Sequence, residues 1–76
     1  MRKEFLHNRI RVFRAEHRLS QSDLAQAIGV SRKTINTIER GVFAPSAVLA
    51  LRIARVFGVA VEEVFALVED SLERKW

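Results

Sequence analysis

The chain has 76 residues, enough for one small domain, with 49% hydrophobic residues and no cysteine. This composition argues against a disordered chain and excludes a disulfide framework or a cysteine-based zinc site. The net charge is +4, and residues 1–40 carry nine basic and four acidic residues, whereas residues 41–76 carry four and five. The positive charge therefore lies in the first half, which favours a polyanionic partner.

The first predicted helix runs from Glu4 or Asn8 to His17. Apolar residues recur along it at helical spacing, and arginines stand between them. The second helix covers about residues 21–28. Ser20 can cap its first turn, and an aspartate three residues further on gives a capping-box pattern.

Residues 21–40 together predict a helix-turn-helix. Gly29 lies where the chain must leave the first helix of the pair with positive φ, which glycine adopts at little cost. Ser31 caps a third helix over about residues 32–40. One face of this helix is apolar, and the opposite face gathers groups suited to phosphates and base edges: Arg32, Lys33, Thr34, Asn36, Thr37 and Arg40. A helix presented in this way fits the DNA major groove.

A loop that ends at Pro45 separates the third helix from the fourth. Ser46 caps the fourth helix, which is predicted over about residues 47–57, and Gly58 ends it. The fifth helix begins near Val61, with two glutamates in its first turn, where they interact favourably with the helix dipole. The sequence therefore predicts five helices.

The C-terminal tail, residues 66–76, allows two structures. Phe65, Val68, Leu72 and Trp76 would share one face of a helix, whereas residues 65–69 could instead form a short strand. These apolar side chains exceed what so small a domain can readily bury. We therefore expect them to form part of a homodimer interface; the alternative is that the tail folds back on the first helix. The expected interface comprises Phe65, Leu67, Val68, Leu72 and Trp76.

Four segments together resemble the Cro/C1-type (XRE) helix-turn-helix family. They are LSQSDLA (19–25), GVSRKTINTIERG (29–41), APS (44–46) and LRIARVFGV (51–59). The resemblance implies an all-α, five-helix fold of the lambda-repressor type, which binds double-stranded DNA as a dimer and regulates transcription. Accordingly, we expect a DNA-binding domain over residues 1–65 and a C-terminal extension, helix or strand, over residues 66–76 that serves dimerisation.

The resemblance also implies roles for individual residues. Base contacts fall on Arg32, Lys33 and Thr37, and Asn36 either joins them or is solvated. Phosphate contacts fall on Gln21, Ser31, Thr34, Arg40, Phe43 and Ser46. Gln21 is further implied to brace the recognition helix, and Arg14 and Glu39 to form a partly buried ion pair between the first and third helices. Arg32 is the strongest candidate for reading a base, because a guanidinium can donate two hydrogen bonds to guanine.

The chain departs from the family pattern at two loop positions. Arg18 stands where the family usually has glycine or asparagine, so we expect backbone strain at positive φ there. Ala44 stands where an asparagine commonly precedes the proline. Outside the motif, Arg9 and Arg11 either widen the positive field or are ordinary solvated charges, and we take the second interpretation.

Other chemistry is not indicated. His7 and His17 have no third ligand at a useful spacing, so we expect no metal site and no cofactor. The sequence shows no Ser/His/Asp set and no glycine-rich phosphate loop, so we expect no enzyme and no small-molecule ligand. No apolar run approaches the roughly 18 residues of a membrane span, and the expected location is cytoplasmic, away from any membrane.

The sequence thus predicts a sequence-specific regulator of transcription, a repressor that binds a palindromic operator in double-stranded DNA as a homodimer. The alternative is an antitoxin-type interaction module that binds a protein partner and also its own operator. A protein of low sequence specificity is disfavoured, because Arg32, Asn36 and Thr37 offer directional groups.

Overall fold

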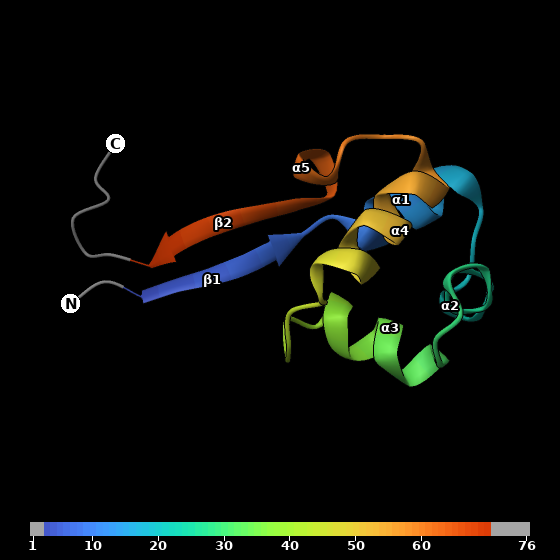
Figure 1. Cartoon of the computed structure of the whole chain (residues 1–76), viewed down its shortest axis with the longest axis horizontal. Coiled ribbons are helices and arrows are strands. Elements are labelled where there is room, and N and C mark those ends of the chain that lie inside the picture. Colours follow the sequence, from blue (N-terminus) through green and yellow to red (C-terminus); the bar gives the residue numbers. More distant parts are fainter. Residues whose placement is uncertain (1–2, 71–76) are drawn as a thin grey trace.

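Within residues 3–70, five helices follow one another along the chain, and the segments on either side of them form a two-stranded antiparallel sheet (Figure 1). The structure is a computed structural model and describes the backbone of residues 3–70 and the side chains of residues 6–68. In chain order, the elements are β1 (Lys3–Asn8), α1 (Ile10–His17), α2 (Gln21–Ile28), α3 (Arg32–Glu39), α4 (Ala47–Phe57), α5 (Val61–Val64) and β2 (Phe65–Asp70).

Serine residues begin three of the helices. Ser20, Ser31 and Ser46 each accept a hydrogen bond from the backbone N–H three residues further on, at 2.9, 3.2 and 3.1 Å. The carboxylate of Asp23 in turn accepts from the Ser20 N–H at 2.9 Å, which completes a capping box. The predictions of α2 and α4 are confirmed to the residue, and α3 ends one residue earlier than predicted.

The α1–α2 linker contains a left-handed arginine. Arg18 has φ 57° and ψ 41°, and it is the one non-glycine residue with positive φ among those described. This confirms the expectation that the family's glycine or asparagine position carries backbone strain here, because a side chain in this region costs about 1–2 kcal/mol.

The first helix begins later than predicted. Residues 3–8 form β1 instead of an early turn of α1, and the prediction of a helical start at Glu4 was wrong. The helix begins at Ile10, two residues after the other predicted start, Asn8, whose side-chain oxygen accepts the backbone N–H of Ile10 at 3.1 Å. The residues before it make backbone hydrogen bonds to β2, in a register that runs from Lys3 opposite Asp70 to Asn8 opposite Phe65.

The same pairing decides between the two structures left open for the tail. Residues 65–70 form a strand, so the helical alternative is wrong for this stretch. Leu72 and Trp76 lie outside the described residues. The fold is therefore the expected five-helix arrangement with a small sheet added to it, where the sequence predicted an all-α domain.

The hydrophobic core draws on every helix. Its buried members are Ile10, Phe13, Leu24, Ala25, Ile28, Ile35, Ile38, Ile53, Ala54, Phe57, Val64 and Phe65. The rings of Phe13 and Phe57 stack at 5.3 Å between centroids, and so connect α1 to α4. The inner face of α3 packs into this core through Ile35 and Ile38, whose side chains are 0% and 1% exposed. The opposite face of α3 is therefore fixed toward the outside.

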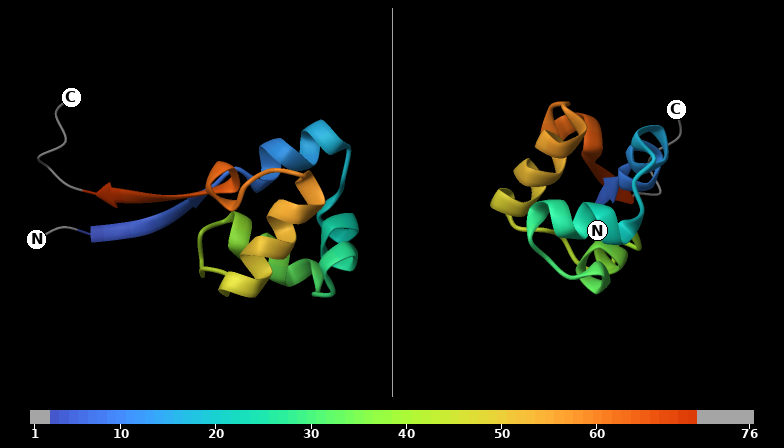
Figure 2. Two further views of the ribbon diagram at one scale, coloured as in Figure 1. Left: turned by 45° about the horizontal axis from the view of Figure 1, so that its top comes forward. Right: turned by 90° about the vertical axis from the view of Figure 1, so that its right-hand side faces the viewer.

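The sheet extends away from the helices, which gives the molecule an elongated shape of 40 × 21 × 19 Å (Figure 2). Its base is anchored, since Phe65 is buried in the core and the Arg9 N–H donates to the Val64 carbonyl at 2.8 Å. Farther out, Leu67 is 67% exposed.

Candidate nucleic-acid interface

The outer face of α3 carries the side chains that the sequence assigns to DNA. Arg32, Lys33 and Arg40 are exposed, and Thr34, Asn36 and Thr37 are half-buried. Gly29, with φ 78°, ends α2 and allows the tight turn that leads into α3. The structure thus places five candidate residues on one helix and the sixth, Arg40, at its C-cap, and two isoleucines on the inner face fix the position of this helix.

Hydroxyl groups on this helix are already engaged. The Thr37 hydroxyl donates to the Thr34 carbonyl at 2.9 Å, so its remaining capacity toward DNA is to accept a hydrogen bond or to offer its methyl group to thymine. Ser31 accepts from the Thr34 N–H and lies 3.0 Å from the Thr34 hydroxyl. Ser31 therefore caps α3 and keeps a hydroxyl that can reorient toward a phosphate.

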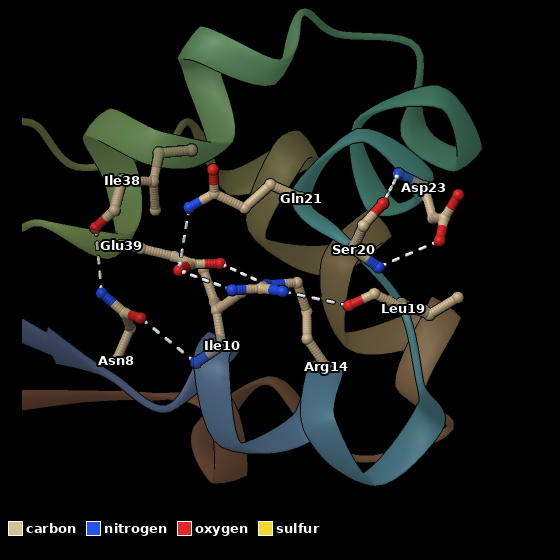
Figure 3. Close-up of polar contacts among 9 residues, drawn as sticks. All are labelled: Asn8, Ile10, Arg14, Leu19, Ser20, Gln21, Asp23, Ile38 and Glu39. Carbon is tan, nitrogen blue, oxygen red and sulfur yellow. Dashed lines mark hydrogen bonds and ion pairs between the residues drawn. The ribbon is translucent and has the colours of Figure 1, made fainter.

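Beneath the outer face, an ion-pair network connects α3 to the rest of the domain (Figure 3). Arg14 donates to Glu39 through Nε at 2.6 Å and through Nη2 at 3.1 Å. Its Nη1 donates to the Leu19 carbonyl at 3.0 Å, and Gln21 Nε2 donates to Glu39 at 3.2 Å. The pair is largely buried, with side-chain exposures of 15% for Arg14 and 8% for Glu39.

This network has an electrostatic consequence. A lone carboxylate at Glu39 would repel DNA phosphates, but a bidentate guanidinium compensates its charge. Gln21, at the first position of α2, contacts Glu39 as the bracing role implied by the resemblance requires. Its predicted phosphate contact is a separate expectation, which these hydrogen bonds do not address.

Asn8 is a structural residue that the sequence analysis missed. Its Nδ2 donates to the Ile38 carbonyl in the last turn of α3, at 3.0 Å, while its Oδ1 accepts from the Ile10 N–H (Figure 3). Asn8 therefore connects the end of β1, the start of α1 and the end of the recognition helix. An asparagine just before an apolar helix is a recognisable capping signal, but a bond across 30 positions is not visible in the sequence.

The loop between α3 and α4 carries the two remaining phosphate candidates. Phe43 is 46% exposed and lines a groove with Leu6, Ile38 and Phe65 at the base of the sheet. Ser46 is exposed and caps α4. Whether either side chain contacts a phosphate stays a prediction.

The expected dimer residues occupy different environments. Phe65 is 8% exposed and belongs to the core of its own chain, whereas Leu67 is 67% exposed and Val68 is half-buried. Leu72 and Trp76 fall outside the described residues. Among the described members of the set, Leu67 and Val68 are thus the ones open to a partner.

Metal-ligating side chains do not gather anywhere in the described part of the chain, where no group of three or more histidine or acidic residues could hold an ion. In the same part, none of the helices has the length and apolar character needed to cross a membrane.

A helix, a tight turn and a second helix with its polar face held outward define the class of helix-turn-helix proteins. A family model described as helix-turn-helix matches residues 10–64. The chain belongs to this family, in its Cro/C1-type (XRE) branch, whose members are DNA-binding regulators of transcription.

Known relatives agree with this assignment. The chain is 46% identical over 66 residues to an uncharacterized HTH-type transcriptional regulator of Methanocaldococcus jannaschii, an alignment that covers 87% of this chain and 100% of that protein. It is 29% identical over 68 residues to the cryptic phage CTXphi transcriptional repressor RstR of Vibrio cholerae, covering 90% of this chain and 61% of the repressor.

A solved structure shows the same fold. The structure resembles the crystal structure of SinR, a master regulator for biofilm formation, in complex with DNA, with a TM-score of 0.64 and 31% sequence identity. The match covers 70% of this chain and 86% of the SinR chain.

Proposed function

We propose that this protein is a sequence-specific repressor that binds a palindromic operator in double-stranded DNA as a homodimer. The observation that carries the proposal is the outer face of α3, which is fixed from below by buried Ile35 and Ile38 and by the Arg14–Glu39 pair. A preorganised face of this kind loses little conformational entropy on binding. The similarity to a phage repressor, RstR, supports repression rather than activation of transcription.

In this proposal, α3 enters the major groove. Arg32, at its first position, donates to a guanine, and Lys33, Asn36 and Thr37 contact neighbouring base edges. The phosphate contacts come from Gln21, Ser31, Thr34, Arg40, Phe43 and Ser46. Base contacts would specify the operator, and phosphate contacts would fix the register of the domain on the duplex.

The sheet supports the homodimer. An isolated two-stranded ribbon is marginally stable in water, and strand edges together with exposed apolar side chains favour association. Leu67, 67% exposed on β2, is such a side chain. A two-fold dimer would present two copies of α3 to half-sites about one helical turn, or roughly 34 Å, apart. We therefore assign dimerisation to the extension over residues 66–76, of which residues 66–70 pair with β1.

Selection of bound duplexes from a random pool, with purified protein at near-physiological salt, tests the proposal. We expect an enriched palindrome, whose half-site spacing gives the separation of the two recognition helices. If no sequence is enriched and binding vanishes as salt is raised, the proposal is wrong. Co-purification of a second polypeptide in that case would favour the antitoxin-type module.

A further inference from the structure

A hollow lies beside α3, between this helix and the junction of β1 with α1. Its walls include Arg9 and Arg11 from the start of α1, Gln21 from the start of α2, and Asn36 and Arg40 from α3 and its C-terminal end. It is therefore built from three segments that are distant in the sequence. Three of these five side chains are arginines.

The positive charge in this hollow is not balanced by its own walls. Glu39 also lines it, but this carboxylate already binds Arg14 at 2.6 Å and accepts from Gln21. Among the side chains of residues 6–68, the structure gives Arg9, Arg11 and Arg40 no carboxylate partner. An anionic occupant would supply the missing charge.

Helix stability does not account for Arg9 and Arg11 at the start of α1. Arg9 and Arg11 stand at the N-cap and in the first turn, where basic groups interact unfavourably with the helix dipole. Arg9 is held in place, because its guanidinium lies over the ring of Phe13 at 5.2 Å from the centroid. Arg11 is exposed and has no such anchor.

The hollow is continuous with the proposed DNA-binding face, since Gln21, Asn36 and Arg40 belong to both. The geometry points to a DNA phosphate site: the backbone that flanks the bases read by α3 lies in this hollow and is bound by Arg9 and Arg11 as well as Arg40. The inference rests on the proposed function and extends the interface from the helix-turn-helix to the β1–α1 junction. It also replaces the interpretation of Arg9 and Arg11 as ordinary solvated charges.

Guanidinium groups suit this role, because they donate paired hydrogen bonds to phosphate oxygens. Phosphate contacts carry no sequence information, but each releases condensed counterions. Losing one contact on duplex DNA should therefore lower the slope of log K against log salt by about 0.9. The variant of the proposed homodimer would lose two such contacts, one in each half-site, so a fourfold rise in salt would cost the wild type about 12-fold more affinity than the variant.

The test compares Arg11→Gln with Arg55→Gln in the full chain, on the duplex selected by the wild type. Both arginines are exposed, and both substitutions remove one positive charge, but Arg55 lies on α4 and outside the hollow. Because the proposed homodimer carries two copies of Arg11, we expect the salt slope to fall by about 1.8 for Arg11→Gln and to stay unchanged for Arg55→Gln. The enriched palindrome should be the same for all three proteins, and thermal unfolding checks that each is folded.

Shortening the duplex gives a second readout. Removing the base pairs outside the half-sites should weaken the wild type more than Arg11→Gln, because the variant has already lost one of the three guanidinium contacts to that backbone. Equal salt slopes for the two variants, or a changed palindrome in Arg11→Gln, would overturn the phosphate site. A wild type that binds no duplex would instead contradict the proposed function, so the two failures are distinguishable.

Discussion

Arg32 occupies the first position of α3, with an exposed side chain and no contact that would give it a structural role among the described residues. If it donates two hydrogen bonds to a guanine, Arg32→Ala should cost about 1–3 kcal/mol of binding free energy in each half-site and relax specificity at one base pair of each. Competition binding with single-base operator variants measures both effects. Arg32→Lys is the matched control, because it keeps the charge but not the paired donors. A lysine variant with wild-type specificity would contradict base reading.

Glu39 is the acceptor of three hydrogen bonds that connect α1 and α2 to α3. Glu39→Ala should lower the free energy of unfolding by about 3 kcal/mol, because it leaves the largely buried Arg14 without its counter-charge. Affinity for DNA should fall as well, since α3 loses its fixed position. Chemical denaturation measures the first effect, and Glu39→Gln, which retains one acceptor oxygen, should be milder. An unchanged melting temperature in Glu39→Ala would refute this account.

Arg18 carries backbone strain that glycine would relieve. Its left-handed conformation, φ 57°, costs about 1–2 kcal/mol for a residue with a side chain, whereas glycine adds about 0.4–1 kcal/mol of unfolded-state entropy. Arg18→Gly should therefore stabilise the domain by up to about 1 kcal/mol. Arg18→Ala removes the same charge and keeps the strain, so it should give no such gain. Equal melting temperatures for the two variants would show that strain is not the relevant term.

Local features of single residues were readable from the sequence. The three serine caps depend on neighbours within about three positions and were predicted from them, whereas the left-handed residue at position 18 was predicted from the family resemblance. The bond from Asn8 to Ile38 depends on the packed fold and was missed. The hollow beside α3 was missed for the same reason, because its walls come from three separate segments.

At the scale of elements, α2 begins with a capping box that depends on pH. Hydrogen bonds from the backbone N–H and the side chain of Ser20 hold the pKa of the Asp23 carboxyl below its ordinary value. A lowered folded-state pKa stabilises the fold above the unfolded pKa, and this stabilisation is lost as pH falls through the folded pKa. Unfolding of wild type and Asp23→Asn should therefore differ most at neutral pH and converge as pH falls below roughly 4. If the difference in stability between the two proteins stays constant across this pH range, the ionised Asp23 carboxylate does not stabilise the cap.

Helices and strands differed in how well the sequence predicted them. The limits of α2 and α4 follow from a serine before and a glycine after each one, so local signals sufficed. β1 and β2 pair across almost the whole chain, from Lys3 to Asp70, and each gains its strand character from the other. The apolar residues before Asn8 fit a helical stripe equally well, which is why the sequence analysis extended α1 too far.

At the scale of the whole molecule, the sheet is the part that the helical body does not cover. It extends away from the helices (Figure 2). Leu67 on β2 is 67% exposed, whereas Phe65, two residues earlier on the same strand, is only 8% exposed. Leu67→Glu should therefore leave the single chain folded and disrupt the proposed dimer, because a charge cannot be buried at an apolar interface without a partner. Sedimentation at micromolar concentration should show a dimer for the wild type and a monomer for the variant.

Loss of the dimer should also change DNA binding, and this change should differ from the effect of damaging the DNA-binding face of α3. A dimer engages its second half-site at a high effective concentration, so a monomeric variant should lose most affinity for the palindrome and little for an isolated half-site. Leu51→Glu, which places the same charge on an apolar side chain of α4 that is 57% exposed, is the matched control and should remain dimeric. If the wild type is monomeric, or if Leu67→Glu still dimerises, the sheet is not the interface. A palindrome could then be read only by two independent copies, whose binding free energies for the two half-sites would simply add.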